Sequence, residues 1–198
     1  RLITIDTDPE NMLEANHPAR VFHNDVKHTF AMHDAIVVGV IASSANDTAT
    51  ENADRTTNKG IYTPENLSAI DKVSQHILNT EGVIAQDVMS FSTVDNITQG
   101  DSGELKFSWM MPNAPASQEE AGKIAEAIAR LPMLQGTLAS SSKNAAAIYV
   151  PIKDKNESFR IAEDIRAFIG ANTTNETLQW HITGLPVAED QFGVEMFI

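Results

Sequence analysis

The chain of 198 residues has no cysteine, which excludes disulfide bonds, cysteine-ligated zinc and thiol catalysis. Basic residues are also scarce, since 14 Lys and Arg stand against 27 Asp and Glu, for a formal net charge of −13. Nucleic acid and anionic lipid headgroups both attract clustered basic side chains. The composition therefore argues against nucleic acid as a partner and against adhesion to anionic lipid, and it indicates a solvated acidic surface.

The chain has no apolar run long enough to cross a membrane. The run 35–42 has eight residues, AIVVGVIA, whereas a spanning helix needs about 20. Its β-branched side chains are typical of a buried strand. The chain begins at Arg1 rather than at Met, so we expect a fragment or processed product of a longer protein.

Motifs for catalysis and cofactor binding are missing as well. There is no glycine-rich phosphate loop and no G-x-S-x-G turn, and no carboxylates are spaced as an acid and base pair. The triplet Asp6-Thr7-Asp8 could hold a metal and a nucleotide-sugar, but the following Pro9 favours a strand that ends in a turn. We therefore expect neither an enzyme nor a cofactor site.

Three histidines, His23, His28 and His33, recur at intervals of five residues. A helix turns by about 100° per residue, so neighbours in this series point about 140° apart. Metal-binding pairs on a helix instead lie four residues apart. The pattern predicts exposed histidines on the polar side of a helix, and no metal site.

The first half of the chain alternates strands and helices. Apolar residues from Pro18 onward, at Val21, Phe22, Val26 and Phe30, predict an amphipathic helix whose stripe faces a core. The other expected elements are a strand at 2–5, a buried strand at 35–42, an exposed loop or hairpin tip at 43–60, a helix that begins at Thr63-Pro64-Glu65, and a strand at 83–91.

The second half repeats a similar order. We expect a strand at 105–111, a helix that begins with a capping box at Ser117–Glu120, a hairpin around residues 140–144, a helix stopped by Gly170, and a strand at 178–182. The fold class is therefore α+β, with two ferredoxin-like βαββαβ subdomains. They occupy residues 1–99 and 100–198, and the polar stretch 99–103 marks the seam.

The cluster Trp109-Met110-Met111 is the one apolar group that could face a hydrophobic ligand. Because Leu105, Phe107, Trp109 and Met111 are every second residue of the expected strand, they should share its buried face. Met110 points the other way and is the candidate for substrate contact, although a weak one.

Several short segments together resemble a known family. They are DTDPENML, HPAR, HDAIVVGV, GIYTPENL, GVIAQDVMSF and the final TGLPV. In this order they resemble the extracytoplasmic loop between the first two membrane helices of RND-superfamily exporters. The closest branch contains Patched-like proteins and the mycobacterial lipid exporters, also called hydrophobe or hopanoid exporters, and the resemblance extends over the whole chain.

The resemblance implies a role and partners. The two halves would be porter subdomains on the periplasmic face of a bacterial inner membrane, in a proton-driven exporter of hydrophobic or amphiphilic molecules. Partners would be the rest of the same transporter, including its second extracytoplasmic loop, a lipid-like substrate, and possible further copies of the protein. Both chain ends should then lie on one side of the fold. The alternative is a free-standing ferredoxin-like module that binds or senses a small molecule.

Overall fold

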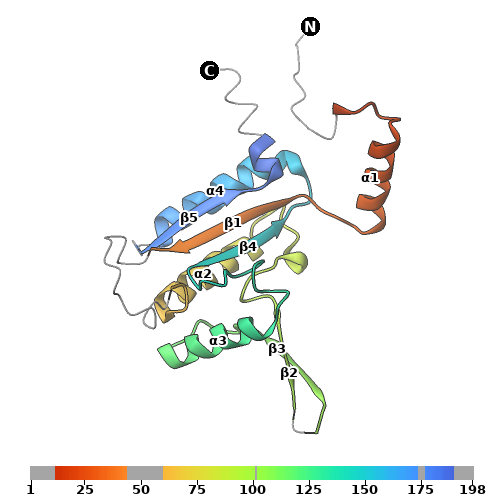
Figure 1. Ribbon diagram of the computed structural model, residues 1–198. Helices are drawn as coiled ribbons and strands as arrows, with labels where there is room; N and C mark the ends of the chain where they lie inside the picture. Colours follow the sequence, from red (N-terminus) through yellow and green to blue (C-terminus); the bar gives the residue numbers. More distant parts are fainter. Residues whose placement is uncertain (1–11, 44–59, 101, 174–176, 190–198) are drawn as a thin grey trace, which may run out of the picture.

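The computed structural model describes residues 12–43, 60–100, 102–173 and 177–189 (Figure 1). Its fold is α+β, as the sequence predicts. The elements in chain order are α1 (Pro18–Thr29), β1 (Ala35–Ala42), α2 (Pro64–Leu78), η2 (Ala85–Asp87), β2 (Asp95–Gln99), β3 (Leu105–Trp109), α3 (Gln118–Arg130), β4 (Ala145–Pro151), η3 (Lys155–Glu157), α4 (Ser158–Asn172) and β5 (Leu178–Thr183).

The main sheet has the strand order β4-β1-β5, and both pairings are antiparallel. Val38 in the middle of β1 lies opposite Ile148 of β4 and Ile182 of β5. The free edge of β4 is partly covered by residues 83–89, through antiparallel bridges at Val83 and Met89. The second sheet is the antiparallel hairpin β2-β3, which projects from the lower end of the body in Figure 1.

The core lies between the main sheet and the helices α2 and α4, which pack against each other. Every second residue of β1 is buried, so its pattern shows one covered face. The apolar stripes of α2 and α4 fill the space above that face, with buried side chains at Leu67, Ile70, Val73 and Ile77, and at Ile161, Ile165 and Ile169.

Helices α2 and α3 begin at the capping residues that the sequence predicts. The Thr63 hydroxyl accepts a hydrogen bond from the Asn66 amide at 3.2 Å, and Pro64 occupies the first turn of α2. The Ser117 hydroxyl caps α3 in the same way, by accepting from the Glu120 amide at 3.2 Å. Gly170 does not stop α4, which continues to Asn172, because an exposed glycine inside a helix costs only about 1 kcal/mol relative to alanine.

In the region 83–99, one prediction is wrong and one strand was missed. Residues 83–91 contain the short helix η2 and two isolated bridges instead of a continuous strand. Strand β2, at Asp95–Gln99, was not predicted. Its sequence, DNITQ, has a single apolar residue, so periodicity could not identify it.

Strand pairing joins the two predicted subdomains. β1 belongs to residues 1–99, whereas its partners β4 and β5 belong to residues 100–198. The predicted seam at 99–103 falls in the turn of the β2-β3 hairpin. The division at residue 99 stays a prediction, but the main sheet crosses it.

Some predictions fall outside the described residues. They are the strand at 2–5, the Asp6–Asp8 triplet, nearly all of the loop 43–60, and the position of the two chain ends. Within the described residues, no helix combines the length and the hydropathy that a membrane span requires.

Candidate functional site

The β2-β3 hairpin is held by its turn and by five pairs of opposed residues. The amide of Gly100 donates to the carbonyl of Glu104 at 2.8 Å, and Gly103 adopts a positive φ of 85° that favours glycine. Ile97 lies opposite Phe107, and Gln99 lies opposite Leu105. Since directly opposed residues point to the same side of a sheet, these side chains share one face with Trp109.

This face of the hairpin is uncovered. Trp109 is 56% exposed, and Leu105 and Phe107 are each 64% exposed, while Ile97 beside them is 40% exposed. We call Ile97, Leu105, Phe107 and Trp109 the hairpin face. A projecting apolar surface of this kind is typical of a site for a hydrophobic ligand or a protein partner.

The prediction for Trp109 and Met110 is wrong, because their exposures are reversed. Met110 is only 4% exposed, and its amide donates to the carbonyl of Val94 at 2.8 Å where the hairpin joins the body. Met111 is fully buried in the core. Met110 is therefore too buried to be a candidate for substrate contact, and Trp109 becomes the candidate instead.

The alternation in strand β3 showed which side chains share a face, but not whether that face is covered. A two-stranded hairpin has no second layer of its own, so its apolar face stays open unless another element packs on it. The sequence does contain a signal of this isolation. Glycines at 100 and 103 and prolines at 112 and 115 separate the strand from the apolar segments of the body.

A second candidate site lies at the C-terminal end of α1. An open recess of about 490 Å³ is lined by Asn24, Lys27, His28, Ala31, Met32 and His33. Its amide, ammonium and imidazole groups can donate hydrogen bonds to an anion. The Lys27 ammonium also lies 3.5 Å from the carboxylate of Asp34, which offsets part of its charge.

The structure brings two of the three regularly spaced histidines together at this recess. His28 and His33 line it, whereas His23 does not. All three are exposed, as predicted. In the described ranges, no group of three or more His, Asp or Glu side chains is close enough to hold a metal ion.

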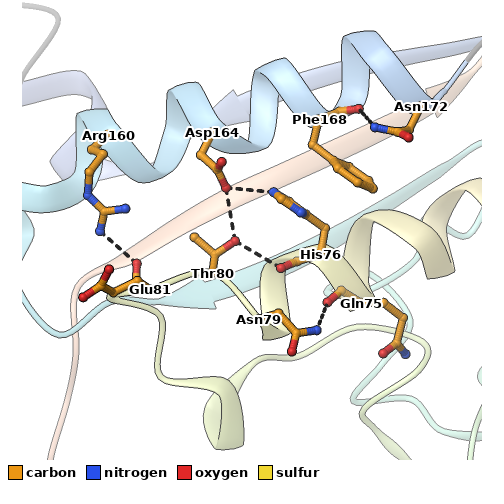
Figure 2. Close-up of polar contacts among 9 residues, drawn as sticks. All are labelled: Gln75, His76, Asn79, Thr80, Glu81, Arg160, Asp164, Phe168 and Asn172. Atoms are coloured by element: carbon orange, nitrogen blue, oxygen red, sulfur yellow. Dashed lines mark hydrogen bonds and ion pairs between the residues drawn. The ribbon is translucent and has the colours of Figure 1, made fainter.

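A cluster of polar side chains joins α2 to α4 (Figure 2). The His76 ring nitrogen Nε2 lies 2.8 Å from Oδ2 of Asp164, and its ring stacks on Phe168 with centroids 4.0 Å apart. The Thr80 hydroxyl lies 3.2 Å from the same Asp164 oxygen and 3.1 Å from the His76 carbonyl. Neither His76 nor Asp164 belongs to a motif that the sequence would mark as a site.

The geometry of this cluster fits a link between helices better than a catalytic relay. In a nucleophile–histidine–carboxylate relay, the hydroxyl bonds to the imidazole. Here the single hydroxyl proton of Thr80 is shared between a carboxylate and a backbone carbonyl, both of which only accept. The Arg160 guanidinium adds a second link by donating to the carbonyl of Glu81 at 2.9 Å (Figure 2).

One buried group in the core has a shifted pKa. Burial raises the pKa of Tyr62 from 10.0 to about 12, because the phenolate would lose its hydration. The Tyr62 ring stacks on Phe91 with centroids 6.0 Å apart. The group lies in the core, so it bears on stability rather than on ligand binding.

Comparison with models of protein families gives no match to this chain, and comparison with curated proteins gives no significant similarity.

Proposed function

We propose that the chain is the extracytoplasmic loop domain of a proton-driven RND-superfamily exporter of hydrophobic or amphiphilic molecules. The observation that carries the proposal is the hairpin face, on which four apolar side chains project from the body without cover. In such an exporter, this surface would line the substrate path outside the membrane or pack against the second extracytoplasmic loop. The sequence motifs that resemble this family support the same assignment.

The proposal includes a ferredoxin-like unit. The segments β1, α2, 83–89, β4, α4 and β5 follow the order βαββαβ along the chain if the bridged segment 83–89 takes the place of the second strand. Across the sheet, 83–89 bridges β4, β4 pairs with β1, and β1 pairs with β5, all antiparallel. This arrangement supports one ferredoxin-like unit built from both halves of the chain. Residues 90–144 would then be an insertion that carries the hairpin and α3.

The partners and the location follow from the proposed role. The domain would sit on the periplasmic face of a bacterial inner membrane and contact the other extracytoplasmic loop of the same transporter. The acidic net charge of −13 argues for apolar contacts over contacts to nucleic acid. The substrate that suits the hairpin face is a lipid-like molecule, since aromatic and aliphatic side chains bury such ligands.

Efflux measurements with the complete reading frame test the proposal. Cells that express it should expel a lipophilic fluorescent dye, and the paired change Phe107→Ser with Trp109→Ser should lower the efflux rate several-fold. The matched control is Phe159→Ser on α4, whose side chain is also exposed but lies outside the hairpin face. Absence of dye efflux across lipophilic dyes, or equal efflux in all three proteins, would count against the proposal.

The second candidate is a free-standing ferredoxin-like module that binds or senses a small molecule. The recess at the end of α1 favours it, because hydrogen-bond donors around an open recess suit a small anion. Stoichiometric binding of a small anion by the chain, together with absence of dye efflux, would support this candidate over the exporter.

A further inference from the structure

Helix α1 lies beside the body (Figure 1), and it carries exposed apolar side chains. Phe22, Val26 and Phe30 follow each other at intervals of four residues, so they share one side of the helix. Phe22 is 70% exposed and Phe30 is 72% exposed, and none of the helix residues is buried. The predicted stripe therefore exists, but it does not face the core.

Exposed apolar side chains also flank α1 along the chain. Met12 and Leu13 precede the helix and Met32 follows it, and all three are exposed. The Arg20 guanidinium donates to the carbonyl of Leu13 at 2.7 Å, which fastens the preceding segment to the helix. A helix of 12 residues is marginal in water without a packed side. The apolar side of α1 is therefore expected to be covered by another surface.

The charges around α1 indicate which kind of surface covers its apolar side. Residues 12–34 contain two basic side chains, Arg20 and Lys27, and three acidic ones, Glu14, Asp25 and Asp34, for a formal charge of −1 with neutral histidine. The whole chain carries −13, so the rest of the molecule holds nearly all of the negative charge. An anionic surface would repel that remainder. A headgroup layer with both phosphate and ammonium groups matches the mixed charges of this segment.

We propose that α1 docks in the plane of a zwitterionic phospholipid bilayer, with Phe22, Val26 and Phe30 buried at the boundary of headgroups and acyl chains. Amphipathic helices with charged flanks and aromatic residues on the apolar side bind membranes in this way. Arg20 and Lys27 lie seven residues apart and so share one flank of the helix. On this flank the Arg20 guanidinium donates to the Leu13 carbonyl, and the Lys27 ammonium lies 3.5 Å from the Asp34 carboxylate.

This inference does not depend on the exporter role. A helix that docks on a bilayer fits a transporter loop, and it fits a free-standing module equally well. Vesicle binding and dye efflux report on different surfaces, α1 and the hairpin face, so the two proposals can fail separately.

Cosedimentation of the 198-residue chain with vesicles tests the inference. The chain should bind vesicles of phosphatidylcholine and phosphatidylethanolamine, and the paired change Phe22→Ser with Phe30→Ser should weaken this binding by at least about tenfold, because it removes most of the inserted apolar surface. Phe159→Ser is the control and should bind like the unchanged chain. Circular dichroism before sedimentation checks that each variant is folded.

Three outcomes would overturn the inference. The first is no binding to zwitterionic vesicles, or binding that the change at Phe22 and Phe30 leaves intact. The second is binding only when phosphatidylglycerol is added, since this would mean recognition of negative charge. The third is a dimer in solution that the same paired change dissociates, because a second copy of the chain would then be the cover of α1.

Discussion

At the scale of single residues, the position of a side chain in the fold decides its burial more than its hydrophobicity does. Met111 and Trp109 are two residues apart and equally apolar in the sequence pattern, yet one is fully buried and the other is 56% exposed. Tyr62 is 4% exposed, although its hydroxyl is polar. Each of these positions leads to a stability measurement.

Substitutions at Trp109 and Met111 should differ sharply in cost. Trp109→Ser removes an exposed side chain and should change the free energy of unfolding by less than about 0.5 kcal/mol. Met111→Ala leaves a cavity in the core and should cost about 2–4 kcal/mol. Urea unfolding followed by circular dichroism gives both values. Equal costs would mean that the hairpin face packs against the body.

The raised pKa of Tyr62 makes stability fall in alkaline solution. The unfolded chain loses the phenol proton near pH 10, whereas the folded chain keeps it to about pH 12. The contribution is therefore fully present below pH 10 and is lost between pH 10 and pH 12, by roughly 2–3 kcal/mol at the upper end. Urea midpoints should fall less steeply from pH 9 to pH 11 for Tyr62→Phe than for the unchanged chain. Parallel curves would show that Tyr62 is not the group responsible.

At the scale of elements, amphipathic patterns and capping residues predicted most helices, the central strand β1 and the edge strand β5 of the main sheet. Ser117, Thr63 and the alternating side chains of β1 act locally, so their signals are visible in the sequence. The irregular segment 83–89 is positioned by pairing with distant residues such as Tyr149, and such long-range pairing leaves no periodic signal. Strand β2 pairs locally with β3, but its sequence DNITQ has a single apolar residue and so has no recognisable pattern either.

Two glycines provide a matched test of local geometry. Gly60 has a positive φ of 53°, and a β carbon there would lie 1.9 Å from the Lys143 carbonyl oxygen. Gly60→Ala should therefore destabilise the protein by more than about 2 kcal/mol. Gly170 lies in α4 with open space around it, so Gly170→Ala should stabilise the protein by about 0.5–1 kcal/mol. Thermal melting of both variants checks the opposite signs, and a shift in the same direction would contradict this account.

The link between α2 and α4 should show energetic coupling. A double-mutant cycle with His76→Ala and Asp164→Ala should give about 0.5–1 kcal/mol, since the pair is bonded but partly exposed. The control pair is Glu163 and Arg166, which both lie in α4. The coupling energy between them should be smaller than that between His76 and Asp164. A coupling of zero between His76 and Asp164 would mean that the contact does not hold the helices together.

At the scale of the whole molecule, the features that bear on function are surfaces rather than buried groups. The hairpin face and the apolar side of α1 are both exposed, and they lie at different ends of the molecule (Figure 1). The sequence predicted both stripes correctly as patterns and placed both in the core. Periodicity reports which residues share a side, but only the arrangement of all elements decides whether another layer covers that side.

The exporter assignment is tested most directly by thiol labelling that determines on which side of the membrane this domain lies. The chain has no cysteine, so Ser141→Cys in the exposed turn before β4 introduces one reporter thiol into the complete reading frame, with cysteines elsewhere in that frame replaced. Ser74→Cys is the buried control and should react only after unfolding. A membrane-impermeant maleimide should label Ser141→Cys in intact cells whose outer membrane has been permeabilised. Labelling that appears only after the inner membrane is lysed would place the domain in the cytoplasm and contradict the exporter assignment.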